Sequence, residues 1–140
     1  MDLKLRGVIQ SGAGRGAFFT RLEWVVEQFE KAMGFAPFPG TLNVRICDED
    51  VAKLDAFFSE RHFQLVPDDP QFCAADLKKV RVNGVAAAAV FPSDDVRIHS
   101  KDVIEIMTHC HIKETLRLSD GDTVTITEFH DTSPNKDGWP

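Results

Sequence analysis

The sequence predicts a mixed β-barrel with a few helices, a mainly β or α+β domain, rather than a doubly wound parallel sheet. Many short strand-like runs are separated by only two or three helical segments, and strands and helices do not alternate regularly. One strand pair is marked by Asn83-Gly84, a dipeptide typical of tight hairpins because both turn residues need positive φ. These observations favour short connections between neighbouring strands.

The composition indicates one domain with a core of ordinary size. The chain has 140 residues, 43% of them hydrophobic, and a net charge of −6. This charge argues against a nucleic-acid partner, because phosphates are neutralised by clustered Lys and Arg. The sequence has no apolar run approaching 18 residues and no signal-peptide pattern, so we expect a cytoplasmic protein without a membrane partner. Cys47, Cys73 and Cys110 are odd in number and far apart, which predicts reduced thiols.

The first half of the chain contains two predicted strands and a predicted helix between them. Apolar residues in positions 3–9 indicate an opening strand, and a glycine-rich segment follows. Apolar residues then recur at helical spacing from Leu22 to Met33, and Gly34 supplies the expected stop. The stretch "APFPGTLNVRI" predicts a proline-bounded turn that leads into a strand ending near Ile46.

The second half predicts another helix, a hairpin and two further strands. The helix begins at about Asp50, and "QLVPDDPQF" after it is expected to be a surface loop. The run "KKVRVNGVAAAAVFP" is the hairpin, "KDVIEIMTH" a strand, "IKETLRL" a short helix and "TVTITEF" the last strand. We expect residues 1–130 to form the barrel domain and residues 131–140, which have little to bury, to form a flexible tail.

The segment "QSGAGRGAFF" carries glycines at three alternate positions, Gly12, Gly14 and Gly16. Glycines allow backbone N–H groups to turn toward an anion, and a helix starting after Gly16 would add its positive end. The Walker pattern G-x-x-x-x-G-K-[ST] is absent from the sequence. By itself the segment therefore fits either a phosphate-binding loop or an ordinary turn.

Thr41 and Asn43 are two positions apart on the strand that follows the proline turn. Alternation along a strand places both side chains on one face. A hydroxyl and an amide oxygen are hard neutral ligands, and Mg²⁺ accepts few protein ligands when water and phosphates complete its coordination shell. A magnesium site and a plain turn with polar neighbours both fit this pattern.

Four ordered segments, "SGAGRGAFF", "GFAPFPGTLNV", "HSKDVIEI" and "IKETLRLSDGDTVTI", carry a resemblance to a known family. The sequence resembles the CTP-dependent riboflavin kinases of archaea over residues 5–126, and "PGTLN" is the most specific element. The resemblance implies a cradle-loop β-barrel and transfer of the γ-phosphoryl group of CTP to the terminal ribityl hydroxyl of riboflavin, giving FMN and CDP.

The resemblance also implies which residues bind the substrates and the metal. Mg²⁺ would be held by Thr41 and Asn43, and the flavin would be contacted by Glu105. The nucleotide would be held by two segments, whose residues are Gly12, Ala13, Gly14, Arg15, Gly16 and Ala17, then Cys110, His111, Ile112 and Lys113.

The residue types agree with this division of roles. Phosphoryl transfer depends more on positioning and charge neutralisation than on a strong base, and the sequence singles out no catalytic base. Arg15 and Lys113 are the cations near the motifs, although each also fits a solvated surface charge. Glu105 lies between two isoleucines, so a strand would point its carboxylate away from them.

Two departures from the family pattern keep other functions open. The chain has Arg97 where the family has a threonine that contacts the flavin, which leaves room for a different alcohol as the acceptor. His99, His109 and His111 leave open a metal site of another kind. A third possibility is a module that binds a nucleotide or a flavin without turnover.

Overall fold

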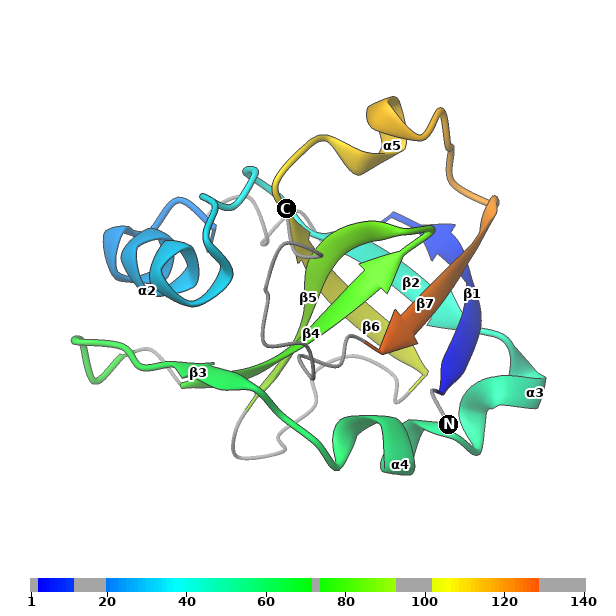
Figure 1. The fold of residues 1–140 in the computed structure, drawn as a ribbon, viewed down its shortest axis with the longest axis horizontal. Helices are drawn as coiled ribbons and strands as arrows, with labels where there is room; N and C mark the ends of the chain where they lie inside the picture. Colours follow the sequence, from blue (N-terminus) through cyan, green and yellow to red (C-terminus); the bar gives the residue numbers. More distant parts are fainter. Residues whose placement is uncertain (1–2, 12–19, 72–73, 93–101, 129–140) are drawn as a thin grey trace, which may run out of the picture.

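The computed structural model describes residues 3–11, 20–71, 74–92 and 102–128 (Figure 1). The elements in chain order are β1 (Lys4–Gln10), α2 (Glu23–Met33), β2 (Leu42–Ile46), α3 (Asp48–Val51), α4 (Leu54–Phe58), β3 (Phe63–Leu65), β4 (Ala75–Val82), β5 (Val85–Pro92), β6 (Val103–Thr108), α5 (Ile112–Thr115) and β7 (Thr123–Glu128). Within these ranges no helix is long and apolar enough to cross a membrane. The predicted tail lies outside the described residues.

Six antiparallel strands form a closed barrel, which confirms the predicted fold class. The strand order is β3-β4-β5-β6-β2-β1-β7, and a further pairing of β7 with β4 closes the sheet on itself. That pairing aligns Val80 with Glu128 and Val82 with Ile126. β3 lies outside the closed ring and pairs with β4 alone among the described strands.

The barrel interior is filled by alternate residues of all six strands. Leu5, Val44, Ile106 and Ile126 are among the buried members of this core. Apolar burial contributes about 25 cal/mol for each Å² removed from water, so this alternation determines which face of each strand points inward. Gly7 allows β1 and β2 to approach closely, because a Cβ there would lie 2.8 Å from the Arg45 carbonyl oxygen.

A second apolar cluster lies between α2 and the outer face of the barrel. Figure 1 shows α2 beside the barrel, next to β3. Phe29 and Met33 of α2 are fully buried with Leu77 of β4 and Met107 of β6. The ring of Phe29 also makes an edge contact with that of Phe63, at 6.4 Å between centroids. The helix is therefore held to the outer face of the sheet by its apolar stripe.

Three sequence expectations differ from the structure. The helix carrying Phe29 and Met33 begins at Glu23, so residues 20–22 separate it from the glycine segment. The single helix expected after Asp50 is two short helices, α3 and α4. Positions 64–65, expected in a loop, belong to β3, which is too short to show an alternation pattern of its own.

Gln28 of α2 forms hydrogen bonds with the backbone of Val66, the residue that follows β3. Its side-chain amide donates to the Val66 carbonyl and accepts from the Val66 N–H, both at 2.7 Å. A neighbouring strand would satisfy a residue's backbone groups in the same manner. Gln28 thus continues the hydrogen bonding of the sheet beyond its last short strand.

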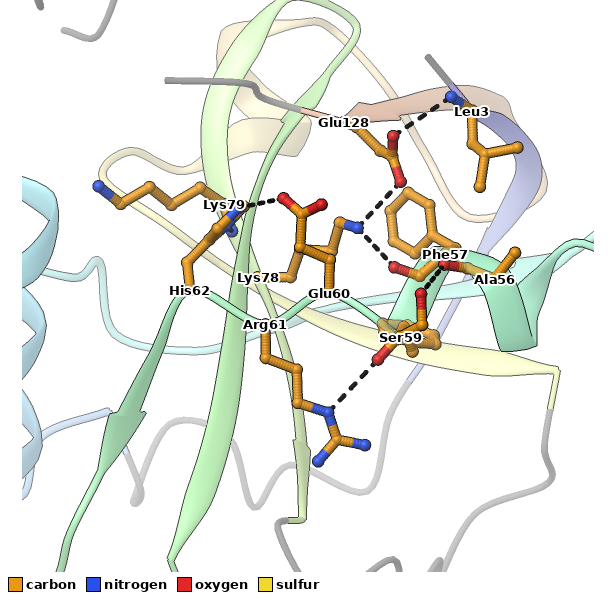
Figure 2. Close-up of polar contacts among 11 residues, drawn as sticks. Leu3, Ala56, Phe57, Ser59, Glu60, Arg61, His62, Lys78, Lys79 and Glu128 are labelled. Carbon is orange, nitrogen blue, oxygen red and sulfur yellow. Dashed lines mark hydrogen bonds and ion pairs between the residues drawn. The ribbon is translucent and has the colours of Figure 1, made fainter. Parts of the chain in front are cut away.

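One end of the barrel contains a buried ion pair (Figure 2). Lys78 is fully buried, and its Nζ donates to Glu128 Oε1 at 2.9 Å and to the Phe57 carbonyl at 2.5 Å. The second oxygen of Glu128 accepts the Leu3 N–H at 3.4 Å. These bonds join β4, β7 and α4, so the charges are paired at the seam where the barrel closes.

Candidate active site

A pocket of about 140 Å³ joins two of the segments identified from the sequence. It is lined by residues 38–42, from the proline turn, and residues 110–113, from the start of α5. The Phe38 N–H donates to the Thr108 carbonyl at 2.6 Å, and the Thr108 hydroxyl donates to the Cys110 carbonyl at 2.7 Å. The end of β6 therefore holds both walls of the pocket in place.

The turn before β2 is fixed by Gly40 and Thr20. Gly40 has φ +109°, in the left-handed region that favours glycine, and its N–H donates to Thr20 Oγ1 at 2.8 Å. Thr20 is 1% exposed and directly follows the glycine segment in the chain. The bond therefore joins the end of the glycine segment to the pocket wall, a role that the local sequence pattern does not signal.

Three oxygen-bearing side chains gather on the outer face of β2 and β6. Leu42 and Val44 point into the barrel core, so Thr41 and Asn43 lie on the opposite face, as alternation predicts. Asn43 stands directly across from Glu105 in the β2–β6 register. The Thr41 hydroxyl donates to Glu105 Oε1 at 3.2 Å. The structure thus brings together the three residues predicted to hold the metal and the acceptor.

The amide of Asn43 is available to a ligand. Asn43 is only 8% exposed, and its side chain makes no hydrogen bond within the described part of the chain. Every fully buried side-chain nitrogen or oxygen among the described residues has a hydrogen-bond partner. The Asn43 amide has none there, so it is not fully buried and remains accessible to solvent. An amide that is mostly buried and has no hydrogen-bond partner among the described residues is suited to bind an ion or a polar substrate.

The donor set suits a hard cation. Hydroxyl and amide oxygens are ligand types that Mg²⁺ takes in proteins, Thr41 and Asn43 supply one of each, and the carboxylate of Glu105 lies beside them. Asn43 and Glu105 lie on the adjacent strands β2 and β6, each hydrogen-bonded on both sides, and Thr41 directly precedes β2. These residues fit the group that the family resemblance implies.

A carboxylate connects the second wall of the pocket to the start of the glycine segment. Asp120 Oδ1 accepts from Lys113 Nζ at 2.7 Å, and Asp120 Oδ2 accepts from the Ser11 hydroxyl. The Lys113 ammonium, with Ser11, holds the pKa of Asp120 below its usual value. The turn that carries Asp120 is tied to β1, because the Gly121 N–H donates to the Ile9 carbonyl at 2.8 Å.

Several predicted residues are not placed by the structure. Positions 12–17 of the glycine segment, together with Arg97 and His99, lie outside the described residues. Both flanks of the segment are described, and each is bonded near the pocket, Ser11 through Asp120 and Thr20 through Gly40.

The histidines near the pocket have aromatic neighbours. The rings of His109 and Phe35 are 4.8 Å apart between centroids, and those of His111 and Phe38 are 5.4 Å apart. Across the described ranges no three His, Cys, Asp or Glu side chains are grouped so that they could hold a metal. The cysteines at 47 and 110 are free thiols.

Comparison with known proteins, rather than the barrel or the pocket alone, gives the class of the protein: a kinase, an enzyme that transfers a phosphoryl group. The chain belongs to the CTP-dependent riboflavin kinase family, described as a domain of unknown function (DUF120), whose model matches residues 9–127. The two pocket walls and the oxygen-bearing row all fall inside the matched range.

Curated relatives agree with this membership. A riboflavin kinase of Saccharolobus solfataricus is 37% identical, with 91% of this chain and 75% of the relative covered. One of Methanobrevibacter smithii is 33% identical, with 89% and 98% covered. A third, of Archaeoglobus fulgidus, is 32% identical, and this chain spans about half of its length, 54%.

Proposed function

We propose that this protein transfers the γ-phosphoryl group of CTP to riboflavin and releases FMN and CDP. The observation that carries the proposal is the pocket in which residues 38–42 meet residues 110–113, beside the row of Thr41, Asn43 and Glu105. The family is CTP-dependent by its name, and the relatives are named riboflavin kinases.

The nucleotide would bind between the glycine segment and the opening of α5. Lys113 has three N–H donors, of which Asp120 takes one, so donors remain for phosphate oxygens. The bond from Ser11 to Asp120 holds one flank of the glycine segment beside that lysine. The bond from Gly40 to Thr20 holds the other flank at the other wall of the pocket. Backbone N–H groups of glycines suit phosphate oxygens, because no Cβ obstructs a close approach.

Thr41 and Asn43 would hold Mg²⁺ through their side-chain oxygens. Bound there, the ion would neutralise charge on the phosphates of the nucleotide. The protein contributes by holding Asn43 on β2 and Thr41 directly before that strand, two positions apart on one face, so that the ligands are already placed when the substrates bind.

Glu105 would receive the acceptor. Its carboxylate lies one strand away from Asn43, and its second oxygen has no hydrogen bond to the described part of the chain. That oxygen can accept from a substrate hydroxyl or ring N–H and orient the acceptor beside the metal site. The positions of the two substrates, rather than a strong base, would then account for most of the catalysis.

The test is a product assay with the purified protein, Mg²⁺ and riboflavin, comparing CTP with ATP. FMN and CDP formed with CTP, and little FMN with ATP, support the proposal. Thr41→Val should remove turnover, while the exposed Glu27→Gln on α2 serves as the matched control. No FMN, with CTP still bound, would instead favour another alcohol as acceptor or a binding module, as Arg97 leaves open.

A further inference from the structure

We propose that Glu105 is a positioning residue for the metal site, in addition to the contact with the acceptor described above. Its carboxylate accepts the hydrogen bond of the Thr41 hydroxyl, which would leave the lone pairs of that oxygen for a cation. The inference rests on the proposed function, because it presumes a cation held by Thr41 and Asn43.

The geometry follows from what a hydroxyl can do. A threonine hydroxyl has one proton and two lone pairs, so it can bind a cation well only when its proton points elsewhere. The structure supplies the acceptor for that proton, Glu105 Oε1, at 3.2 Å from Thr41 Oγ1. Thr41 is β-branched, so its side chain has few rotamers, and this bond selects one direction for the proton.

The backbone keeps Glu105 beside both ligands. β6 is hydrogen-bonded to β2 on one side and to β5 on the other, and Glu105 faces Asn43 directly across the first of these ladders. A side chain on such a strand has less freedom than one on a loop. The carboxylate is therefore a fixed partner of the site, like the outer-shell groups that orient the ligands of other metals.

Charge acts in the same direction as orientation. Thr41 and Asn43 are both neutral, whereas the adjacent Glu105 carries a negative charge that favours a divalent cation. Removing the carboxylate should weaken metal binding for both reasons. A glutamine at this position keeps an oxygen that accepts the Thr41 proton but loses the charge, so it separates the two contributions.

Glu105 also connects the proposed metal site with the site of the acceptor. One carboxylate oxygen accepts from Thr41, and the other is available to the acceptor. A metal bound to Thr41 would restrict Glu105 through the hydrogen bond between them, and an acceptor bound to Glu105 would restrict Thr41 in the same way. Binding of the cation and of riboflavin should therefore be mutually favourable, and by linkage the effect must be equal in both directions.

The experiment is a titration with Mn²⁺ as the probe, in the presence of saturating CDP, with free Mn²⁺ followed by electron paramagnetic resonance. The proteins are wild type, Glu105→Gln, Glu105→Ala, Thr41→Val and, as a matched control, Glu27→Ala on the exposed face of α2. Glu105→Ala should weaken Mn²⁺ binding at least tenfold and Glu105→Gln less. Adding Glu105→Ala to Thr41→Val should cause a smaller further loss than Glu105→Ala causes in wild type, because the orienting effect acts through Thr41 and only the effect of the charge remains.

The outcomes separate this inference from the proposed function. CDP affinity without metal and the midpoint of thermal unfolding should match in the Glu105 variants and wild type. Equal Mn²⁺ affinity in Glu105→Ala and Glu27→Ala would overturn the positioning role while leaving the metal site itself standing. Absence of Mn²⁺ binding by wild type with CDP bound would overturn the proposed metal site, and the role of Glu105 with it.

Discussion

Lys113 and Asp120 form an ion pair of 2.7 Å at the wall of the pocket, and the same carboxylate also accepts from Ser11 beside the glycine segment. The pair is partly exposed, so its own contribution to folding stability is small. Its importance lies in where it holds the lysine, between two segments that are far apart in the sequence.

Replacing Lys113 should weaken the binding of CTP. Lys113→Met removes a donor with a positive charge, and a hydrogen bond to a charged group is worth about 1.5–3 kcal/mol. We expect the KM for CTP to rise roughly tenfold or more, since each tenfold corresponds to about 1.4 kcal/mol. Steady-state kinetics with CTP varied would measure this, with the exposed Lys4→Met as control. Equal KM values in the two variants would remove Lys113 from the nucleotide site.

Thr20 should prove necessary for the shape of the pocket. Thr20→Val keeps the volume but removes the acceptor of the Gly40 N–H, and an unpaired buried group costs about 1–3 kcal/mol. We expect lower stability to urea and weaker CTP binding, whereas Thr20→Ser, which keeps the hydroxyl, should retain both. A valine variant with normal stability and affinity would show that the turn holds its shape without this bond.

The buried Lys78 should be essential for folding stability. Lys78→Met removes the ammonium group paired with the Glu128 carboxylate, and breaking a buried ion pair costs about 3–5 kcal/mol. Urea denaturation would measure the loss. The double variant Lys78→Met/Glu128→Gln should be less destabilised than Lys78→Met, because the negative charge of Glu128 is removed together with the positive charge of Lys78. Lys31→Met, at an exposed position, should change stability by no more than about 0.5 kcal/mol.

His62 should make stability fall as the pH drops below 6.5, the usual pKa of a histidine. Its Nδ1 accepts the Lys79 N–H at 2.8 Å and its Nε2 lies 3.1 Å from Glu60, so the folded protein holds a neutral ring. Burial lowers the pKa of His62 below the usual 6.5, although Glu60 opposes the shift and Lys78 and Lys79 reinforce it. The unfolded chain therefore binds the proton more readily. Stability is full above pH 6.5 and falls as the pH drops toward the folded-state pKa.

The measurement is the free energy of unfolding in urea at several pH values from 7.5 to 5. In His62→Gln, whose amide oxygen can still accept the Lys79 N–H, this part of the pH dependence should vanish. Asp50 should not interfere. The Arg6 N–H and Lys53 lower the pKa of Asp50 below its usual 3.8, so its contribution is lost only at more acidic pH. An identical slope in the two proteins would exclude His62 as the group responsible.

The sequence predicted the parts of the fold that local patterns determine. Asn83 and Gly84 have φ +47° and +87° in a two-residue turn, with Val82 paired to Val85, as the hairpin signal required. Alternation correctly placed Thr41 and Asn43 on one face, although β2 begins at Leu42 and Thr41 directly precedes it. The closure of the barrel through β4 and β7 could not be predicted from local sequence patterns, because it joins strands that are distant in the chain.

The same distinction holds for the candidate site. Residues on motifs, such as Thr41, Glu105 and Lys113, were found from residue type and from resemblance to the family. Thr20 and Asp120 were missed, because their roles come from contacts with partners 20 and 109 positions away. A threonine after a glycine segment and an aspartate in a turn are ordinary in sequence, and only the folded chain shows what they hold.

The amide of Gln28 has a consequence for how the protein behaves at high concentration. In the described part of the chain β3 lies outside the closed ring, and the outer strand of a sheet is where two molecules can join their sheets. By engaging both backbone groups of Val66, Gln28 denies them to a strand from a neighbouring molecule. A single side chain on α2 thereby covers the backbone groups where the sheet could otherwise be extended.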